Sequence, residues 1–347
     1  MAGINQHYLP RLLLKGFASR IAGKEILTLA YQKGKTVFEP NIKGISAERY
    51  FYGKQGEVSA DDEITELEGK YGAFIDELRE ENDGEQIQDS RVVEFIAHLC
   101  IRTKHLRDSL RESSEFLMDK ISEYLSDYDN IKKFILGNPK LAEEVVGKMM
   151  EEQQFPPVYK DMLIMLITQW APLLLDENQS EFKMIVESLV EPFKSMIPKA
   201  LKQEHIKLLA QHPIPEPRVE DYKKLRWFVY APASSVILGD VGVLIETSSA
   251  KRFKSLNDKG DEIRNIFLPI SSSRVIVGTP LSRPKINFDI NEVIAKSSRE
   301  FFISSTRSPE MDSLHLKIGD ESEVISKEEL EQIVREGFIH ENIEQSE

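Results

Sequence analysis

The sequence contains very little cysteine: Cys100 is the only one among 347 residues. A single thiol cannot form an intramolecular disulfide or supply a cysteine-rich zinc module. Both absences favour a reducing, cytoplasmic setting. Because Cys100 lies in a segment with helical periodicity, a packed and inert thiol is expected rather than a catalytic nucleophile.

The sequence also has no long hydrophobic run. Its most apolar stretches, 162–175 and 236–245, are interrupted or fall short of the roughly 20 residues that cross a bilayer. Near the N-terminus, an apolar run of only three leucines is ended by Lys15, which is too short for a signal or transit peptide. We therefore expect no membrane partner.

The sequence motifs of the common cofactor and hydrolase sites are missing as well. There is no Gly-x-Gly-x-x-Gly fingerprint, no phosphate loop ending in Gly-Lys-Ser/Thr, no His-Glu-x-x-His and no Gly-x-Ser-x-Gly. No nucleotide cofactor is therefore predicted.

What is present is an ordinary globular composition with an uneven charge. Hydrophobic residues make up 41% and charged residues 30%, which fits one large domain or two ordinary ones. The net charge of −13 is concentrated in residues 308–347, which carry −9, whereas residues 1–24 hold four basic residues and no acid. The basic segment could bind nucleic acid or another phosphate-bearing ligand, and the acidic tail could bind a protein partner or cover that basic surface. The alternative is a solvated tail on a nearly neutral body.

Apolar periodicity predicts an α+β fold with β elements at both ends around a large helical middle, and a predominantly helical chain overall. Residues 1–58 form a β-containing segment, 59–212 a helical region, and 218–347 a β-rich region with the acidic tail. The breaker cluster at 212–217 marks the second boundary. The two β regions could also combine into one composite domain.

Three helices matter for the candidate sites. Helical spacing predicts one helix over 61–78 and a single longer helix over 91–125. A third helix, over 290–298, has Asp289 or Asn291 as its expected cap, and a strand is expected at 301–304.

The first candidate site is the segment Asn5-Gln6-His7-Tyr8-Leu9-Pro10-Arg11. His7 offers an imidazole for acid–base work, and Arg11 offers a guanidinium for an anion. The alternative is a frayed chain end.

The second candidate is Glu68, which lies at the margin of the apolar stripe of the 61–78 helix. A carboxylate in that position needs a hydrogen-bond or charge partner. It could be a catalytic or metal-binding acid, or simply one half of a structural ion pair.

The third candidate is the polar face of the 91–125 helix, where Glu94, His98, Arg102 and His105 fall within a narrow arc. His98 and Arg102 are four residues apart and meet side by side. The alternative is a solvated helix face. His98 and His105 lie about 10 Å apart along the axis, so a metal shared by these two histidines is not expected.

The fourth candidate is Asp240, in Leu238-Gly239-Asp240-Val241-Gly242 between two apolar β runs. Either this segment is a hairpin turn, or it holds a carboxylate at a strand end with glycines that allow close approach of another group.

The opening His7-Tyr8-Leu9-Pro10-Arg11, followed by Leu14-Lys15-Gly16-Phe17, resembles the start of the bacterial domain-of-unknown-function 4238 family. Further similarity covers 46–52, Leu67-Glu68, 95–97 with Arg102-Thr103, Leu238-Gly239-Asp240 and 267–270, so it extends over about residues 5–280. Leu9 in place of Val, and His98 with Cys100 where Gln is common, depart from the pattern. The resemblance implies a bacterial or phage-related cytosolic protein and supplies no reaction.

The matched polar positions suggest a hypothesis that joins the four candidates. The N-terminal segment would pack between the helices and the C-terminal sheet and make a cleft. His7, Glu68 and Asp240 would be catalytic, with Glu68 and Asp240 holding Mg²⁺ or Mn²⁺, while Arg11, Arg102 and His98 would bind substrate. That composition fits metal-assisted phosphodiester hydrolysis, as in a nuclease. The alternative is a non-catalytic sensor or protein-interaction module with a structural buried polar network.

Overall fold

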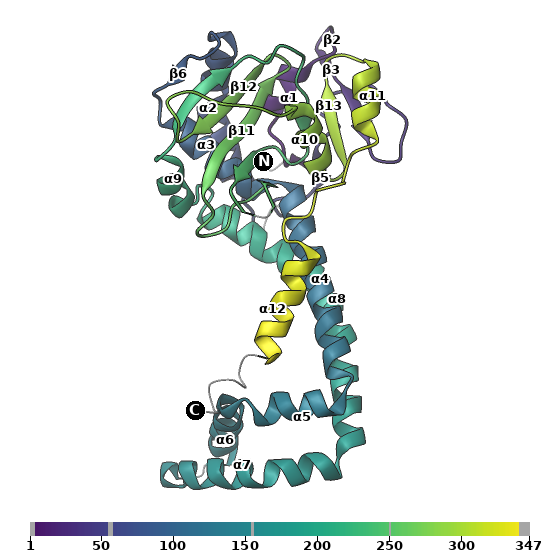
Figure 1. The fold of residues 1–347 in the computed structure, drawn as a ribbon, viewed down its shortest axis with the longest axis vertical. Coiled ribbons are helices and arrows are strands. Elements are labelled where there is room, and N and C mark those ends of the chain that lie inside the picture. The colour runs from purple at the N-terminus through teal and green to yellow at the C-terminus, as the bar shows by residue number, and fades with distance from the viewer. Residues whose placement is uncertain (1–3, 55–57, 154–155, 250, 340–347) are drawn as a thin grey trace. The chain divides into compact units, whose positions relative to one another are not determined.

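A computed structural model describes residues 4–339 except 55–57, 154–155 and 250 (Figure 1). The chain forms two compact units, each discontinuous in sequence. Unit 1 comprises Met1–Leu110 and Leu201–Val324, and unit 2 comprises Arg111–Ala200 and Ile325–Glu347. The helical middle expected over 59–212 is thus divided between them.

Unit 1 is built on a six-stranded antiparallel sheet with strand order β10-β9-β11-β12-β7-β6. The longest strands are runs of β-branched and aromatic residues that are buried along most of their length, as expected for a central sheet. The strands are β6 (Gln86–Ile87), β7 (Arg226–Tyr230), β9 (Leu244–Thr247), β10 (Phe253–Lys254), β11 (Ile263–Ser271) and β12 (Arg274–Thr279).

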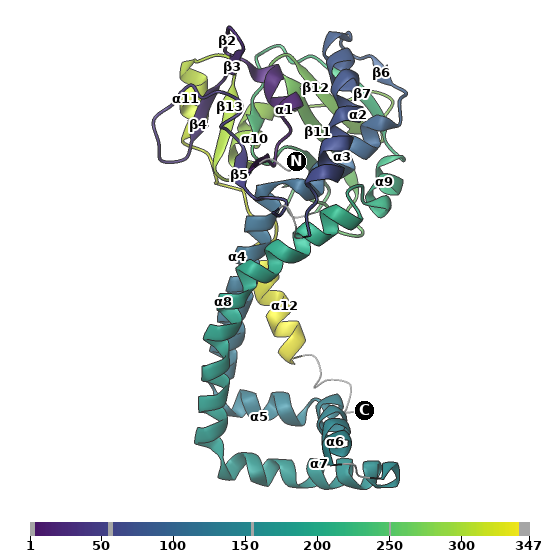
Figure 2. The ribbon, with the colours of Figure 1, turned by 180° about the vertical axis from the view of Figure 1, so that it is seen from behind.

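Helices α2 (Asp61–Glu80) and α3 (Arg91–Arg102) lie along one face of this sheet (Figure 2). Every apolar position predicted to face the core of the 61–78 helix is buried. The N-terminal segment passes close to α2 and the sheet: Arg79 Nη2 donates to the carbonyl oxygen of Leu12 at 2.5 Å, and Ser272 N donates to that of Gly16 at 3.0 Å. The short helix α1 (Arg11–Leu14) follows the candidate motif, and α9 (Glu216–Tyr222) packs against α3.

The two β regions predicted at opposite ends of the chain meet in one small sheet of unit 1. Strand β13 (Phe301–Ser304) lies between β4 (Leu29–Gln32) and β8 (Leu238–Gly239), with Phe301 opposite Gln32. Helix α10 (Ile290–Ser297) packs against β8, β10 and β13. Two further antiparallel pairs are β1 (Asn5–His7) with β5 (Ala47–Arg49) and β2 (Arg20–Ala22) with β3 (Glu25–Leu27).

The prediction of one helix over 91–125 is wrong in one respect. Thr103 adopts extended backbone angles, with φ −74° and ψ 150°, and separates α3 from α4 (Lys104–Leu125). Its Oγ1 accepts a hydrogen bond from Leu106 N at 3.2 Å, so the side chain caps the helix that follows. The polar face predicted for this helix is not solvated at His98, Arg102 and His105, because all three residues are buried.

The first part of the acidic region is also not a solvated tail. Helix α11 (Pro309–His315) buries Met311 and Leu314, and His315 Nε2 lies 2.7 Å from the carbonyl oxygen of Gln32. Residues 308–324 are therefore an integral part of unit 1. Residues 340–347, the end of that acidic region, lie outside the described residues.

Unit 2 consists of helices. Among its described residues, the fully buried apolar side chains include Ile131, Val146 and Leu175. One helical segment, Pro157–Glu177, is long and apolar enough to cross a membrane by length and composition, and only 6% of its most apolar stretch is buried. The helices are α5 (Tyr128–Leu136), α6 (Pro139–Gln153), α7 (Lys160–Glu177), α12 (Lys327–Ile339), the end of α4 and the first part of α8 (Gln179–Gln211).

Candidate functional site

Arg102, the last residue of α3, is the centre of a buried polar network in unit 1. Its side chain is fully buried. Nη2 donates to Glu68 Oε1 at 2.7 Å and to the carbonyl oxygen of His7 at 2.7 Å. Nε donates to the hydroxyl of Tyr52 at 2.9 Å, and that hydroxyl in turn donates to the carbonyl oxygen of His7 at 2.8 Å. One guanidinium therefore joins α2, α3 and strand β1.

His98 completes this network on the same helix face. Its Nε2 lies 3.2 Å from Arg102 Nη1, and its Nδ1 lies 2.7 Å from the carbonyl oxygen of Pro213. Since a guanidinium can only donate, Nε2 accepts and Nδ1 carries the proton. Burial, together with the positive charge of Arg102, lowers the pKa of His98 to about 3. His98 is therefore a neutral ring fixed in one tautomer.

The predicted N-terminal residues have different roles in this network. His7 contributes its backbone oxygen, while its ring Nε2 lies 3.2 Å from the carbonyl oxygen of Ile42. Burial is the main cause that lowers the pKa of the His7 imidazole, and the Arg11 charge adds to it. Arg11 itself is exposed. The structure thus brings His7, Glu68, His98 and Arg102 together, with Arg11 nearby at the surface.

Glu68 is the part of the network that reaches solvent. Its side chain is 29% exposed, whereas that of its partner Arg102 is 0% exposed. The contact is a charge-assisted hydrogen bond of normal length. In this geometry the Glu68 carboxylate balances the charge of a guanidinium that has no access to water, which is the ion-pair alternative.

Asp240 belongs to a separate arrangement. It follows β8, and its two carboxylate oxygens accept the backbone N–H groups of Arg299 at 2.8 Å, Glu300 at 2.6 Å and Phe301 at 3.2 Å. Burial raises the pKa of Asp240 to about 7, against the opposing effect of these donors. The carboxylate holds the start of β13 against β8. Gly242, at φ +69°, closes the turn through a hydrogen bond to the oxygen of Gly239 at 3.0 Å, so the turn and the strand-end alternatives both apply.

The contacts of Glu68 and Asp240 lend no support to a metal shared by the two carboxylates. Within the described part of the chain, no group of three or more His, Cys, Asp or Glu side chains is placed to hold a metal ion. One oxygen of Glu68 faces a guanidinium, and both oxygens of Asp240 face amide hydrogens. These donors use part of the acceptor capacity of each carboxylate and tie Glu68 and Asp240 to different parts of the chain.

Sequence reasoning missed a second arginine–histidine pair. Arg107 Nε donates to His205 Nδ1 at 2.9 Å, and His205 Nε2 lies 2.6 Å from the carbonyl oxygen of Ile101. Arg107 also donates to the carbonyl oxygen of Phe51 at 2.9 Å, and its guanidinium lies 3.6 Å from the centre of the Phe51 ring. Burial lowers the pKa of His205 to about 4. The only available signal was the aromatic run at 50–52, which supplies both Phe51 and Tyr52.

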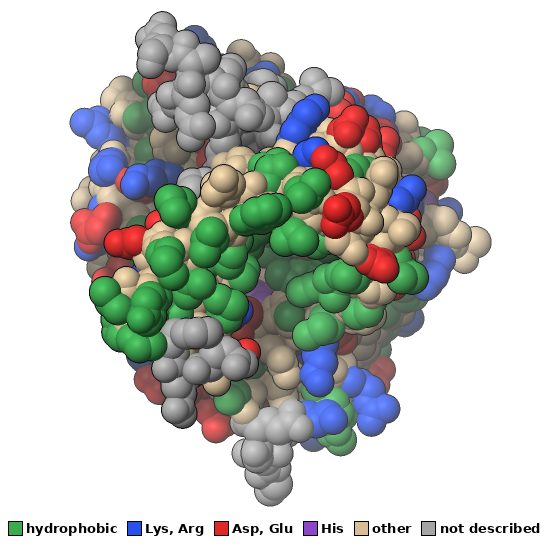
Figure 3. All heavy atoms as spheres, turned by 90° about the horizontal axis from the view of Figure 1, so that it is seen from below, with side chains coloured by type: hydrophobic (Ala, Val, Ile, Leu, Met, Phe, Trp, Pro, Cys, Tyr) green, Lys and Arg blue, Asp and Glu red, His purple; other side chains and the backbone are tan. Residues whose placement is uncertain are grey.

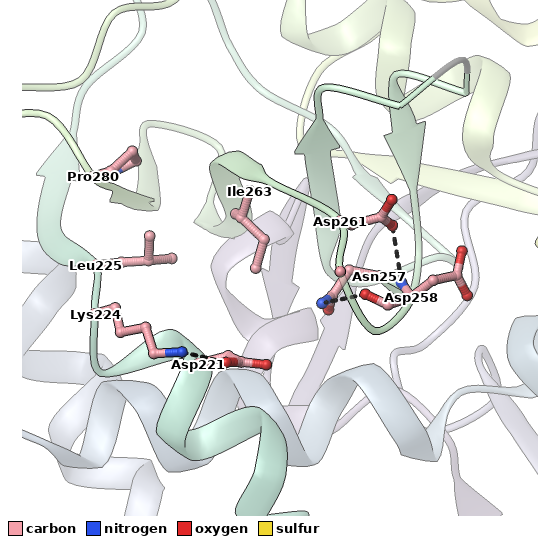
Figure 4. A pocket seen from close by; sticks show the side chains of 9 residues that line it. Asp221, Lys224, Leu225, Asn257, Asp258, Asp261, Ile263 and Pro280 are labelled. Carbon is pink, nitrogen blue, oxygen red and sulfur yellow. Dashed lines mark hydrogen bonds and ion pairs between the residues drawn. The ribbon is translucent and has the colours of Figure 1, made fainter.

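Surface pockets of unit 1, two of them beside α9 and the N-terminal motif, lie outside the Arg102 network. One, of about 370 Å³, is formed by the end of α9 and the loop at 257–261 (Figure 4). Its charges are paired internally: Lys224 donates to Asp221 at 2.7 Å, and Lys254 donates to Asp258 and Asp261. The other, of about 260 Å³, lies beside the N-terminal motif. Its lining includes Tyr8, Ser46, Glu48, Lys104 and Glu300.

The fold and these contacts define an α+β protein whose motif residues form a buried polar framework. The family described as "Protein of unknown function (DUF4238)" matches residues 5–333. The chain belongs to this family. No curated protein and no solved structure matches it.

Proposed function

We propose that the protein is a non-catalytic interaction module, in which unit 1 is a fixed scaffold and unit 2 presents an apolar helical surface to a protein partner. The observation that carries this proposal is the exposure of α7, whose most apolar stretch is only 6% buried. Exposed apolar surface of this extent, on a helix that neighbouring helices cover on one side only, is typical of a binding surface.

The polar network of unit 1 supports a scaffold rather than a reaction centre. Arg102 uses Nε, Nη1 and Nη2 on four acceptors of the protein itself: two side chains of α2 and α3, the Tyr52 hydroxyl and the His7 oxygen. Four of its five N–H groups are therefore used within the protein, which holds the guanidinium in place and leaves at most one for a substrate.

The proposal is tested by site-specific photo-crosslinking in the native host. A photoreactive phenylalanine analogue replaces Trp170, which is 52% exposed on α7. The matched control replaces Leu316, which is 85% exposed in unit 1. We expect a discrete protein adduct from position 170 and none from position 316. Absence of any adduct at 170, under conditions where the protein is intact, overturns the proposal.

The hydrolase hypothesis with Mg²⁺ or Mn²⁺ stays a prediction with less support, because the geometry leaves Glu68 and Asp240 in separate networks. Binding of nucleic acid or another phosphate-bearing ligand at the exposed Arg11 also stays a prediction. Both are tested by incubating the protein with DNA, RNA and nucleotides, with Mn²⁺ and with chelator. Chelator-sensitive turnover that is lost in a folded Glu68→Gln variant would establish the enzyme and displace the scaffold proposal.

A further inference from the structure

Tyr8 is a buried side chain that lines the pocket beside the N-terminal motif. Only 5% of Tyr8 is exposed, and no described residue forms a hydrogen bond with its hydroxyl group. Burial raises the pKa of Tyr8, and the carboxylates of Glu48 and Glu300, which line the same pocket, are among the charges that raise it further. The hydroxyl group therefore keeps its proton and lies on the pocket side of the ring. A buried hydroxyl without a partner is costly, so it points to a partner that enters the pocket.

Backbone contacts hold Tyr8 in a fixed position. Tyr8 N donates to the carbonyl oxygen of Ser46 at 3.0 Å, and Leu9 N donates to Ser46 Oγ at 3.1 Å. The Tyr8 ring packs against that of Phe51, with 5.5 Å between the ring centres. Ser46, which also lines the pocket, has φ +58°, a left-handed conformation that serine rarely adopts. The pocket is therefore formed before any ligand binds.

The polar side of the pocket has more unused hydrogen-bond acceptors than donors. Lys104 Nζ donates to Asp108 and to Glu300 Oε1, in the second case at 2.7 Å. Lys202 Nζ donates to Glu48 Oε1 at 3.4 Å. The second carboxylate oxygens of Glu48 and Glu300 have no donor among the described residues, and these side chains are 37% and 39% exposed. Since Lys104 retains only one unused N–H, the pocket favours a ligand that donates hydrogen bonds.

The charges around the pocket favour a cation. The residues of the polar side comprise three carboxylates and two lysine ammonium groups. Asp240 and Arg107, which act on these residues from the core, add one charge of each sign. One negative charge is left over, and a positively charged ligand would balance it.

The opposite side of the pocket is apolar and largely aromatic. It is lined by Phe38, Ile45 and Phe301, of which Phe38 is 41% exposed. Aromatic rings beside carboxylates are typical of sites that bind an ammonium ion with hydrocarbon substituents. The volume of about 260 Å³ is slightly below the roughly 300–1,000 Å³ of most small-molecule sites, so the ligand is small.

We propose that this pocket of unit 1 binds a small organic amine, with the ammonium group among Tyr8, Glu48 and Glu300 and the hydrocarbon part against Phe38. The proposal goes beyond the interaction-module function and does not depend on it. That function rests on unit 2, where hydrophobic side chains gather on the surface (Figure 3).

The test is isothermal titration calorimetry of the full chain with n-hexylamine, which is protonated near neutral pH. 1-Hexanol and hexanoate are the matched neutral and anionic probes. We expect hexylamine to bind with a dissociation constant below about 1 mM, and the other two probes to bind at least tenfold more weakly. A chain that binds no hexylamine, or binds hexanol or hexanoate as tightly, overturns the proposal.

Two variants then locate the bound amine. Tyr8→Phe removes only the hydroxyl group, so it should weaken hexylamine binding about fivefold or more without lowering the melting temperature. Glu48→Gln removes a negative charge and should weaken binding about tenfold or more. The matched control is Glu66→Gln, because Glu66 pairs with Lys70 at 2.9 Å on α2 and does not line the pocket, and it should leave binding unchanged.

An affinity that either Tyr8→Phe or Glu48→Gln leaves unchanged places the amine elsewhere and overturns the assignment. A lower melting temperature of Tyr8→Phe would also overturn it, because the hydroxyl would then have a partner within the protein. Nα-acetyl-lysine amide presents the same ammonium group on a peptide backbone. If it binds more tightly than hexylamine, the pocket receives a lysine of another protein, and the proposal of a small amine is wrong.

Discussion

Replacing Arg102 with alanine tests whether the candidate site is a scaffold or a reaction centre. The substitution removes a fully buried guanidinium and leaves its acceptors behind. Two of these, the Glu68 carboxylate and the His98 ring, lose their charge-assisted partner. The oxygen of His7 retains the Tyr52 hydroxyl as a donor.

The expected loss of stability is large because Arg102 is fully buried and its removal leaves Glu68 without a charge partner. Breaking a buried ion pair by removing one partner costs about 3–5 kcal/mol, mostly through the charge left uncompensated. Glu68 can turn partly to water, since its side chain is 29% exposed, which places the effect near the lower limit. The cavity left by the arginine side chain adds to it. We therefore expect Arg102→Ala to lower the free energy of unfolding of unit 1 by about 3–4 kcal/mol.

Tryptophan fluorescence in urea can follow unit 1 separately. The chain has two tryptophans, of which Trp227 is 4% exposed in β7 and Trp170 is 52% exposed in α7. In a Trp170→Phe background, the emission of Trp227 reports the unfolding of unit 1. The companion variant is Glu68→Gln, which keeps a hydrogen-bond acceptor for Arg102 but leaves the charge of the fully buried guanidinium unbalanced, so it should also cost about 3 kcal/mol.

An Arg102→Ala variant that stays within about 1 kcal/mol of its background would refute the reasoning. It would mean that the guanidinium contributes little to the fold, as expected of a residue retained for binding a substrate. Loss of ligand binding or turnover at unchanged stability would then assign Arg102 to a functional site.

Three further predictions concern unit 1. The stability of unit 1 should fall as the pH drops from about 6.5 toward 4, because the unfolded chain takes up protons at His98, His105 and His205, whereas burial lowers their folded pKa values to between about 3 and 4. Each histidine contributes up to about 1.4 kcal/mol per pH unit, so His205→Gln should flatten the dependence of the melting temperature on pH. Gly16→Ala should lower the melting temperature, because the added Cβ would lie 2.1 Å from the oxygen of Ile270, whereas Gly69→Ala in α2 meets nothing within 4 Å and should raise it by helix propensity. Removing residues 308–347 should unfold unit 1 or lower its melting temperature strongly, because it deletes the buried Met311 and Leu314; an unchanged melting temperature would mean that α11 is dispensable.

Caps and apolar periodicity in the sequence predicted helices and strands well where the stabilising residues are close neighbours along the chain. The 290–298 helix is capped as expected, with Asp289 Oδ1 accepting from Asn291 N at 2.9 Å, and the 301–304 strand is confirmed as β13. The break at Thr103 was missed because its sequence contains neither proline nor glycine, so only tertiary contacts of the neighbouring residues favour an extended backbone there.

Pairing between distant segments could not be predicted from local pattern. Strand β13 lies between β4 and β8, so Phe302 pairs with Tyr31 on one side and Gly239 on the other. Periodicity gives the exposed and buried faces of each strand but not its neighbours. For the same reason the sequence allowed a composite domain as an alternative without deciding for it.

The sequence predicted that residues of the candidate site lie next to one another, but it did not predict what each residue binds. His98 and Arg102 had to be adjacent because they are four residues apart on one helix. Their environment depends on groups that carry no sequence signal, namely the carbonyl oxygens of His7 and Pro213. Because these oxygens bind His98 and Arg102, the residues predicted for acid–base chemistry form a hydrogen-bonded framework in the structure.

The polar motifs, which suggested a catalytic site, lie in unit 1, whereas the exposed apolar surface of α7 lies in unit 2 and contains no motif. Short polar motifs are rare combinations and therefore suggest a function. In unit 1, however, Arg102 and Asp240 each bind backbone groups, and the His7–Arg11 segment supplies one of them, the oxygen of His7. The exposed side of α7 contains only Met, Leu and Trp, a composition that is typical of an ordinary core helix; its residues are Met162, Met165, Leu166, Trp170, Leu173 and Leu174. Only its exposure of between 38% and 60% separates it from a core helix. The free energy of association depends on the apolar area removed from water. The exposed side of α7, which carries no sequence motif, would therefore be stabilised more by a partner than the motif residues of unit 1.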